Sequence, residues 1–463
     1  MSGFLTTKIL NQEYAQNVKA HIGINPKKDL IKRVGKMETK IQENLFQKYK
    51  EKDKQFNTHF DDTYQYLVNF SQTKNLPIHR WFYYQEGYSP KLVENIINHL
   101  NLNKRKNIFV FDPFAGSGTT LLKSKEMGYK SVGFEINPFS AFMIKVKTRN
   151  YTKNDLKEYT AFSIPKKSSI KDVYSKYELK IIQNLFDKEK LEKIETIKES
   201  INKVSNKKVR DLLYVTLLSI LEPVSNYRKG GNGLKKKRVN KNLDPVDSFL
   251  EKRKEIFEDL STQTKEGVEP QIINDSCLNI GKYGINGIDI SIFSPPYANC
   301  FDPFEVYKIE LWLGNFIEGY DDLRSKRKSA LTSNLNANLK KEFDSEHRTE
   351  LLNKILNLLN EKELWDKRLP KMLDTYFFDM FVLLNELYNK TKNGGYCVIV
   401  VGNSSYGNIA IPTDVILGEI GQKIGFNVEE IIVGRTNETS AQQHTKIGEL
   451  KEYIRESLVI LRK

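Results

Sequence analysis

A short apolar run followed by a glycine-rich turn constrains the fold of this chain more than any other stretch of sequence. Residues 108–111 are rich in strand-forming side chains and are followed by Asp112, and the turn at 113–118 leads into a helical pattern. A second predicted strand, 131–134, is followed by Glu135. Strand, glycine turn, helix and strand, with an acid after each strand, predict the beginning of a doubly wound α/β sheet.

The same sheet resumes later in the chain after two long interruptions. The predicted fold class is α/β, a doubly wound, Rossmann-like sheet with mostly helical insertions. Further strands are predicted at 271–275, 288–293, 396–401, 428–433 and 456–461. We divide the chain into an N-terminal helical segment (1–75), three parts of the sheet domain (76–149, 271–299 and 376–463) and two helical insertions (150–270 and 300–375).

The glycine turn has the geometry of a small-molecule site. Gly116 and Gly118 allow backbone N–H groups to approach a ligand, and the following helix directs its N-terminus at negative charge. Glu135 ends the next strand, seventeen residues beyond Gly118, where an acid can bind two ribose hydroxyls. Dinucleotide enzymes and methyltransferases share this pattern, so the turn alone leaves both classes open.

Two details favour S-adenosylmethionine over NAD as the ligand of this turn. The turn lacks the third glycine of GxGxxG, and Asp112 stands before it. Asp112 would repel a pyrophosphate but can orient the α-ammonium group of S-adenosylmethionine, which contains no phosphate. The plainer alternative is that Asp112 only caps the turn. Thr119 and Thr120, at the start of the helix, are placed to hydrogen-bond the carboxylate of the same ligand.

A second candidate site is Ser294-Pro295-Pro296-Tyr297, which directly follows the predicted strand at 288–293. It therefore lies at the carboxyl end of a strand, where open α/β sheets bind ligands. The prolines remove N–H donors, and the Ser294 hydroxyl and Pro295 carbonyl can accept the two hydrogens of an exocyclic amine. The lone pair of the amine then faces a methyl donor, for an in-line displacement without a covalent enzyme intermediate. Tyr297 offers a stacking face for a base extruded from a duplex; the alternatives are core packing for Tyr297 and a plain turn for the motif.

These motifs resemble those of a known family. Residues 112–120 resemble motif I of the amino-methylating DNA methyltransferases, and the SPPY sequence resembles their motif IV in the form typical of cytosine-N4 enzymes. Residues 134–138, 274–276 and 84–90 resemble motifs II, III and X. The resemblance implies a methyltransferase sheet that binds S-adenosylmethionine and methylates the N4 amino group of cytosine in duplex DNA. It covers about 80–150, 270–310 and 395–463.

The resemblance also implies which residues bind and react. Asp275 of motif III is expected to reach the adenine amino group of the cofactor. Residues 440–443 also look familial, without an assigned role. Motif I precedes motif IV here, whereas many cytosine-N4 members have the opposite order, so the target base is inferred from the serine of motif IV. The expected catalytic residues are Ser294, Pro295, Pro296 and Tyr297, and the expected cofactor-binding residues are Tyr84, Asp112, Phe114, Gly116, Gly118, Thr119, Thr120, Glu135, Asn137 and Asp275.

A glycine loop inside the first insertion carries six cations within residues 226–238. By itself this pattern indicates a mobile, solvated surface loop. Beside a DNA methyltransferase resemblance, it predicts contacts with phosphates or a DNA groove. The formal charge of +15 is compatible with a polyanionic partner, although a lysine-rich composition can also reflect the source genome. The predicted DNA-binding residues are Arg228, Lys229, Lys235, Lys236, Lys237 and Arg238.

Several classes of protein are not indicated. The 3 cysteines form no CxxC pair and the 6 histidines no HxxxH pair, so neither a disulfide framework nor a metal site is predicted. The N-terminal sequence lacks the pattern of a signal peptide, and no run approaches the roughly 18 apolar residues of a membrane span. We therefore expect a cytoplasmic protein without a membrane partner.

Several functions remain open at this stage. An adenine-N6 DNA methyltransferase is the nearest alternative, because the same geometry serves both amines. An RNA amino-methyltransferase acting on guanine N2 and a non-catalytic nucleic-acid-binding protein are more distant. We expect double-stranded DNA as the partner and a place in a restriction-modification system, in which a separate restriction endonuclease is possible. The recognition sequence cannot be read from the chain.

Overall fold

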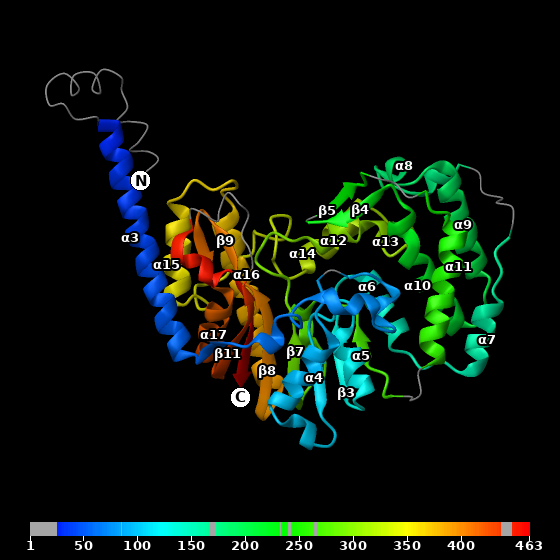
Figure 1. Ribbon diagram of the computed structural model, residues 1–463, viewed down its shortest axis with the longest axis horizontal. Coiled ribbons are helices and arrows are strands. Elements are labelled where there is room, and N and C mark those ends of the chain that lie inside the picture. Colours follow the sequence, from blue (N-terminus) through cyan, green and yellow to red (C-terminus); the bar gives the residue numbers. More distant parts are fainter. Residues whose placement is uncertain are drawn as a thin grey trace.

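The main sheet of the computed structural model contains eight strands in the order β1-β11-β12-β8-β7-β2-β3-β6 (Figure 1). Strand β12 is antiparallel to both neighbours, and the other neighbouring pairs are parallel. The structure describes residues 26–84, 86–165, 172–231, 233–238, 242–262, 267–436 and 447–463, with side chains from residue 40 onward. The strands are β1 (Thr58–Phe60), β2 (Phe109–Asp112), β3 (Lys130–Phe134), β6 (Gln271–Ile273), β7 (Ile288–Phe293), β8 (Thr391–Gly402), β11 (Asn427–Thr436) and β12 (Arg455–Arg462).

Both faces of the central strands are buried, as expected for a largely parallel sheet with helices on either side. All of β7 is buried. In β8, Ile399 and Val401 join the core beneath α16 (Leu369–Lys390) and α17 (Thr413–Ile424), and Val398 and Val400 join the core beneath α4 (Pro90–His99). This alternation confirms the predicted doubly wound α/β fold.

The first insertion forms a helical body with its own core, beside the carboxyl ends of β2 and β3 (Figure 1). Its core includes Leu191, Leu213 and Phe249. Two short strands, β4 (Tyr227–Gly230) and β5 (Gly233–Lys236), form an antiparallel hairpin at its upper edge. The helices that precede, form and adjoin this body are α5 (Thr119–Glu126), α6 (Pro138–Lys147), α7 (Lys153–Ala161), α8 (Ile182–Leu185), α9 (Lys188–Asn202), α10 (Lys207–Val224), α11 (Pro245–Ser261), α12 (Pro303–Val306) and α13 (Lys308–Leu313).

The second insertion is less helical than predicted. Two of its helices, α14 (Tyr320–Ser329) and α15 (Glu350–Asn360), are separated by about twenty residues without regular structure. Polar side chains there bind α16 instead: Arg348 forms a two-point ion pair with Asp374, and Lys341 bonds both oxygens of Asp379. The short hairpin β9 (Ser404–Tyr406) and β10 (Ile409–Ile411) lies on the same side of the sheet as α15.

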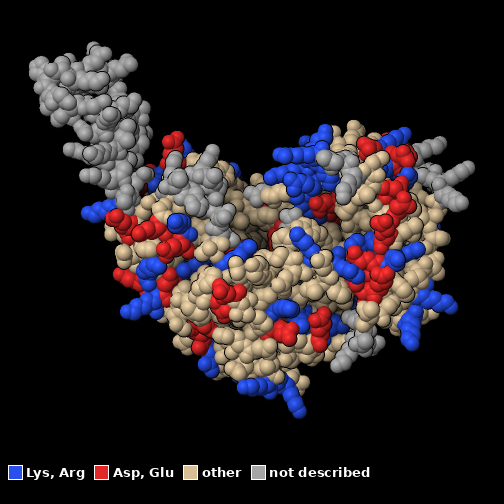
Figure 2. Space-filling model, in the orientation of Figure 1, with Lys and Arg blue, Asp and Glu red and all other residues tan. Residues whose placement is uncertain are grey.

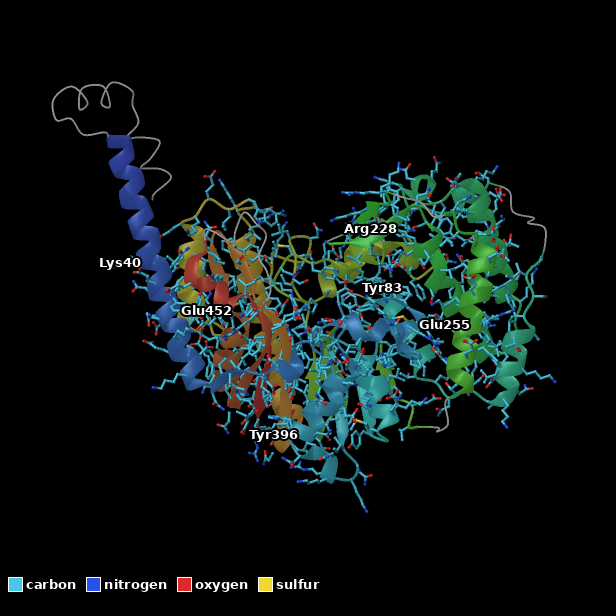
Figure 3. All side chains as sticks on the ribbon, in the orientation of Figure 1. Lys40, Tyr83, Arg228, Glu255, Tyr396 and Glu452 are labelled. Atoms are coloured by element: carbon cyan, nitrogen blue, oxygen red, sulfur yellow. The ribbon has the colours of Figure 1, made fainter. Side chains whose placement is uncertain are left out.

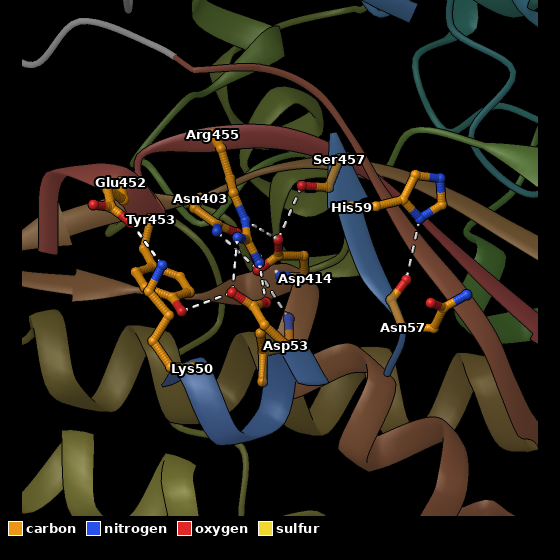
Figure 4. A network of polar contacts seen from close by, with 11 residues as sticks. Lys50, Asp53, Asn57, His59, Asn403, Asp414, Glu452, Tyr453, Arg455 and Ser457 are labelled. Carbon is orange, nitrogen blue, oxygen red and sulfur yellow. Dashed lines mark hydrogen bonds and ion pairs between the residues drawn. The ribbon is translucent and has the colours of Figure 1, made fainter. Parts of the chain in front are cut away.

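The N-terminal segment belongs to the sheet domain more closely than predicted. Helix α3 (Pro26–Gln55) leads into β1, which pairs with β11 at the sheet edge. A polar network then ties the end of α3 to β12 (Figure 4): Asp53 accepts hydrogen bonds from Arg455 Nη2 (2.7 Å) and the Tyr453 hydroxyl (2.7 Å), and Arg455 Nε donates to Asp414 (2.8 Å). Strand β1 was not predicted because its three largely exposed residues carry no alternating apolar pattern.

Candidate active site

The carboxyl ends of β2, β3 and β7 open onto a cavity of about 450 Å³. A narrow pocket adjoins it, and the two share six lining residues: Tyr84, Glu86, Gly87, Phe114, Gly116 and Ser294. The glycine turn and the SPPY sequence, which are more than 170 residues apart in the chain, therefore face one continuous space. The reason is the strand order, since β2 and β7 are neighbours.

The glycine turn has the left-handed backbone that only glycine adopts without strain. Gly116 has φ +52° and Gly118 has φ +82°. A Cβ atom on Gly118 would lie 2.9 Å from Cγ2 of Ile144 on α6, and one on Gly116 would lie 3.4 Å from Cε1 of Tyr84. The turn is thus fixed both by its dihedral angles and by close packing. Lys147 supports it from α6 by donating to the Ser117 carbonyl (3.1 Å).

Two buried acids lie on either side of this turn. Asp112 accepts a hydrogen bond from Phe114 N (2.9 Å) and lines the narrow pocket, and Glu135 accepts from Gly116 N (2.7 Å) and Asn137 N (2.8 Å) and lines the large cavity. Burial raises the pKa of each carboxyl to about 7, although these hydrogen bonds lower it. A cationic or hydroxyl-bearing ligand would replace the water that these carboxylates have lost.

Aromatic rings close the narrow pocket. Tyr84 stacks on Tyr307 with centroids 4.8 Å apart and an interplanar angle of 8°. The Tyr307 hydroxyl donates to Glu86, which lines the same pocket. The ring of Phe114 lies 5.7 Å from that of Phe293 at the end of β7. Tyr84 and Phe114 were predicted here from motif resemblance, whereas Tyr307 carries no sequence signal.

The structure separates the two threonines that were predicted to contact the ligand carboxylate. Thr119 lines the narrow pocket, and its hydroxyl lies 3.1 Å from that of Ser117. Thr120 is fully buried, and its hydroxyl contacts the Tyr88 hydroxyl and donates to the Ile292 carbonyl (3.3 Å). Thr120 therefore joins α5 to β7, which corrects its predicted contact with the ligand. The sequence does not distinguish the two threonines, because they are adjacent at the start of α5 and differ only in the direction in which the helix points their side chains.

Two further predicted cofactor ligands, Asn137 and Asp275, are not among the residues that line the two spaces. Asn137 caps α6 by accepting from Phe139 N (3.1 Å). Asp275 accepts from Ser276 N, Asn279 Nδ2 and the Tyr283 hydroxyl, and these bonds lower its pKa against the effect of burial. The residues that line the cavity at this position are Ser276 and Cys277. The contacts of Asn137 and Asp275 with the cofactor stay predictions.

The SPPY sequence forms one wall of the large cavity, and all four of its residues line it. Ser294 and Tyr297 are partly buried and hydrogen-bond each other. The ring of Tyr297 packs on the backbone of Gly402, where an added Cβ would lie 2.6 Å from Cε2. Arg435 and Glu456 line the same cavity and were not predicted, because single charged residues at strand ends carry no pattern. A flat aromatic face and a hydroxyl acceptor thus stand next to the glycine-turn pocket.

The predicted basic loop is an ordered hairpin in which the six cations have different roles. Arg228, labelled in Figure 3 at the upper edge of the helical body, is exposed, as are Lys235, Lys236 and Arg238. Lys229 is buried and its ammonium bonds Glu310 (2.6 Å). The Lys237 ammonium donates to the carbonyls of Glu222, Pro223 and Ser225 at the end of α10.

These contacts correct the DNA-binding prediction for Lys229 and Lys237, whose ammonium groups bind the protein itself. Arg228 and Lys229 are successive residues of β4 whose side chains point to opposite faces, so one is exposed and the other is buried. Parts of other predicted motifs lie outside the described residues: Gln85 of motif X, Asn232 of the basic loop, and residues 440–443. Among the residues that the structure describes, no group of His, Cys, Asp and Glu side chains could hold a metal ion. The described helices include none long and apolar enough to cross a membrane.

Comparison with known proteins identifies the class to which this fold and site belong. Residues 10–146 match the family described as DNA methylase, and residues 90–273 match D12 class N6 adenine-specific DNA methyltransferases. The chain belongs to the amino-methylating DNA methyltransferases. Its cofactor is S-adenosylmethionine, the methyl donor of the family, and its substrate is DNA.

Within this class, the chain is similar to Type II methyltransferases along most of its length. It is 31% identical to M.AvaI of Nostoc sp. over 415 residues, which cover 81% of this chain and 85% of that protein. It is 28% identical to M.BsoBI of Geobacillus stearothermophilus over 451 residues, covering 86% and 88%. M.MvaI of Kocuria varians is 24% identical over 400 residues, covering 80% and 86%. The chain thus belongs to the Type II DNA methyltransferase family.

The residues present fit this cofactor. Its sulfonium and ammonium groups are cations, and the buried carboxylates of Asp112 and Glu135 face the two connected spaces. Gly116 lines both spaces without a Cβ atom, and Gly118 packs against Ile144 on α6. Asp112 would hold the ammonium and Glu135 the ribose hydroxyls, with Tyr84 along the methionine end.

Proposed function

We propose that this protein methylates the N4 amino group of cytosine in duplex DNA, after extruding the target base into the large cavity. The observation that supports this is the position of Ser294, which lines both the narrow pocket beside Asp112 and the large cavity beside Tyr297. An amine bound at Ser294 would lie at the junction between the cofactor pocket and the base cavity. The serine at this position is typical of cytosine-N4 enzymes by the motif resemblance above.

The residues of the cavity wall supply positioning and electrostatics. The extruded base stacks on Tyr297, whose ring is fixed on Gly402. The Ser294 hydroxyl and the Pro295 carbonyl accept the two amine hydrogens, which turns the nitrogen lone pair toward the methyl donor. S-adenosylmethionine supplies an electrophilic methyl group when bound. The nitrogen gains that methyl group and releases one proton to solvent in the open cavity.

We also propose that DNA lies in the hollow between the helical body and the rest of the molecule. Figure 2 shows this hollow and a cluster of lysine and arginine side chains on its upper edge, where Figure 1 places β4 and β5. The exposed cations of the hairpin would contact phosphates, so segment 150–270 would take part in target recognition and segment 300–375 would close around the duplex. A partner restriction endonuclease would cleave DNA that lacks the methyl group.

The hairpin proposal has a quantitative test. Replacing Arg228, Lys235 and Lys236 by glutamine should reduce the slope of log binding constant against log salt by about 0.9 per lost phosphate contact. The control is Lys254→Gln, whose side chain is 79% exposed and belongs to α11, a helix that lies apart from the hairpin in Figure 1. Fluorescence anisotropy with a labelled duplex at several salt concentrations measures both. An unchanged slope in the triple variant would place the phosphate contacts elsewhere.

An adenine-N6 enzyme is the second candidate, because the match to D12 class adenine-specific enzymes covers residues 90–273. Transfer of radiolabelled methyl groups to duplex DNA, single-stranded DNA and RNA, followed by mass spectrometry of the nucleosides, separates the possibilities. We expect N4-methylcytosine from duplex DNA, and loss of activity in Ser294→Ala. A product of N6-methyladenine would overturn the proposed target base. Methylated RNA would overturn the proposed substrate. The absence of product from all three nucleic acids would indicate a non-catalytic protein. Methylome sequencing of cells with and without the gene then gives the recognition sequence.

A further inference from the structure

Two charged side chains line the base cavity from β11 and β12, which β8 and β7 separate from the glycine-turn strand β2. Arg435 lies near the end of β11 and Glu456 near the start of β12, directly opposite each other in the ladder. Arg435 Nε donates to Glu456 Oε2 at 2.7 Å, and both residues line the large cavity together with Tyr297. Their side chains are 33% and 9% exposed, so the carboxylate is buried and the guanidinium reaches into the open space.

This pair and Ser294 are neighbours of the same phenol. Burial raises the pKa of Tyr297, the charge of Glu456 raises it further, and a hydrogen bond with Ser294 and the charge of Arg435 lower it. The Tyr297 ring also packs on Gly402, the ladder partner of Glu456, and Ser294, Tyr297, Arg435 and Glu456 line one cavity. A base that stacks on the Tyr297 ring with its amine at Ser294 would turn the rest of its hydrogen-bonding edge along this wall.

The pair is held from behind. In β12, Arg455 and Ser457 point to the face opposite Glu456, and both bond Asp414 (2.8 and 2.9 Å) in the network of Figure 4. The start of the strand is thus fixed, and with it the carboxylate that orients the guanidinium. Arg435 bonds Glu456 through Nε, and its side chain, which is 33% exposed, lines the cavity.

We propose that Arg435, oriented by Glu456, binds the N3 and O2 atoms of the target cytosine and so selects cytosine over adenine. Cytosine presents two adjacent acceptors, N3 and O2, next to its amine, and parallel N–H groups of a guanidinium match such a pair. Adenine presents only N1 and then a C–H group. Arg435 is then a specificity-determining residue and Glu456 a positioning residue. The proposal rests on the cytosine-N4 assignment above.

The test removes the N3 acceptor of cytosine and the guanidinium donor of Arg435, separately and together. Duplexes with the mapped recognition sequence carry cytosine, 3-deazacytosine (C–H in place of N3) or adenine at the target position. They are methylated by the full-length wild type, Arg435→Met, Arg435→Lys and Glu456→Gln. The matched control is Arg462→Met, whose arginine pairs with Glu429 at the opposite end of the same two strands (3.5 Å). Calorimetric binding of S-adenosylmethionine reports whether each variant is folded.

For the wild type we expect kcat/KM to fall by about 10- to 100-fold on 3-deazacytosine, the size of a lost bidentate base contact. Arg435→Met should lose a similar factor on cytosine and show no further loss on 3-deazacytosine, and its preference for cytosine over adenine should collapse. Arg435→Lys should keep part of that preference, and Arg462→Met all of it. Glu456→Gln should lower the preference while retaining cofactor affinity, which gives a second measurement if Arg435→Met is poorly folded.

The outcomes separate this inference from the proposed function. If the wild type makes N4-methylcytosine and Arg435→Met still loses the full factor on 3-deazacytosine, the contact to N3 comes from another residue and the inference is wrong while the function stands. An unchanged base preference in both Arg435→Met and Glu456→Gln has the same meaning. If the wild type makes N6-methyladenine, the proposed target base is wrong, and the proposed contact of Arg435 with N3 and O2 of cytosine is wrong as well.

Discussion

The buried ion pair between Lys229 and Glu310 joins the basic hairpin to the wall of the cofactor pocket. Both side chains are fully buried, their charged atoms are 2.6 Å apart, and the ammonium lies 4.7 Å above the ring of Tyr307, which stacks on Tyr84. Glu310→Gln would leave the ammonium without its nearest counter-charge. The carboxylate of Glu222 remains at 3.4 Å, so we expect the lower end of the range for a broken buried pair, about 3 kcal/mol.

This loss can be measured as a shift in thermal unfolding. An unfolding entropy of about 2.1 cal/mol/K per residue gives roughly 1 kcal/mol/K for the 463-residue chain, so 3 kcal/mol lowers Tm by about 3 °C if the chain unfolds as one unit. Lys229→Met should cost less, because the isolated Glu310, whose pKa burial already raises, can take up a proton. The affinity for S-adenosylmethionine should fall in both variants, since Tyr307 and Tyr84 lose their support.

The reasoning depends on coupling between the two charges. The double variant Lys229→Met/Glu310→Gln should therefore be more stable than the sum of the single effects implies. If the losses in free energy of unfolding of the two single variants simply add in the double variant, the two charges are not coupled and the reasoning is wrong. Glu258→Gln on α11 is the control, because its partner Lys254 is 4.0 Å away and both side chains are more than half exposed, so we expect a change within about 0.5 kcal/mol.

Two further predictions concern the glycine turn and its acids. Burial raises the pKa of Asp112 and Glu135 to about 7. The stability that these carboxyls give the free protein is therefore fully present below their unfolded pKa near 4 and is lost as the pH rises through 7. Affinity for the cationic cofactor should rise by about tenfold from pH 6 to 8, because the carboxyls ionise in that range. Calorimetry across that range tests this, and Asp112→Asn should flatten the curve; a pH-independent affinity would contradict it. Gly118→Ala places a Cβ 2.9 Å from Ile144 at φ +82° and should weaken cofactor binding by at least about tenfold, while Gly128→Ala, at φ +78° with nothing within 4 Å, should cost stability alone.

The central sheet and the glycine turn could be predicted because their signals are local. Strand 288–293 was predicted with the bounds it has, and the strand before the turn was displaced by one residue, Phe109–Asp112 against 108–111. The strand before the turn follows from an uninterrupted apolar run, strand 288–293 follows from alternating isoleucines, and positive φ angles favour glycine, so each leaves its mark in a single stretch of sequence. The predicted residues Asp112, Gly116, Glu135 and Ser294 accordingly line the narrow pocket and the large cavity that adjoins it.

What could not be predicted depends on contacts between distant residues. The burial of Lys229 is set by Glu310, 81 positions away, and nothing in the run of cations around it distinguishes it from the exposed Lys235. Tyr307 and Arg435 enter the site from segments without a motif, because their positions follow from helix packing and strand pairing. Sequence patterns report the period of an element well and the partners of one charged side chain poorly.

The adjacency of β2 and β7 has a consequence for how such enzymes diversify. The cofactor turn follows one strand and the amine-binding sequence follows its neighbour, and the two meet only through the sheet. A gene rearranged so that the second strand was translated first would build the same pocket, provided the new connections could span the sheet. Circular permutation would therefore preserve the catalytic centre, and relatives with the two motifs in the opposite order along the chain can share the same chemistry.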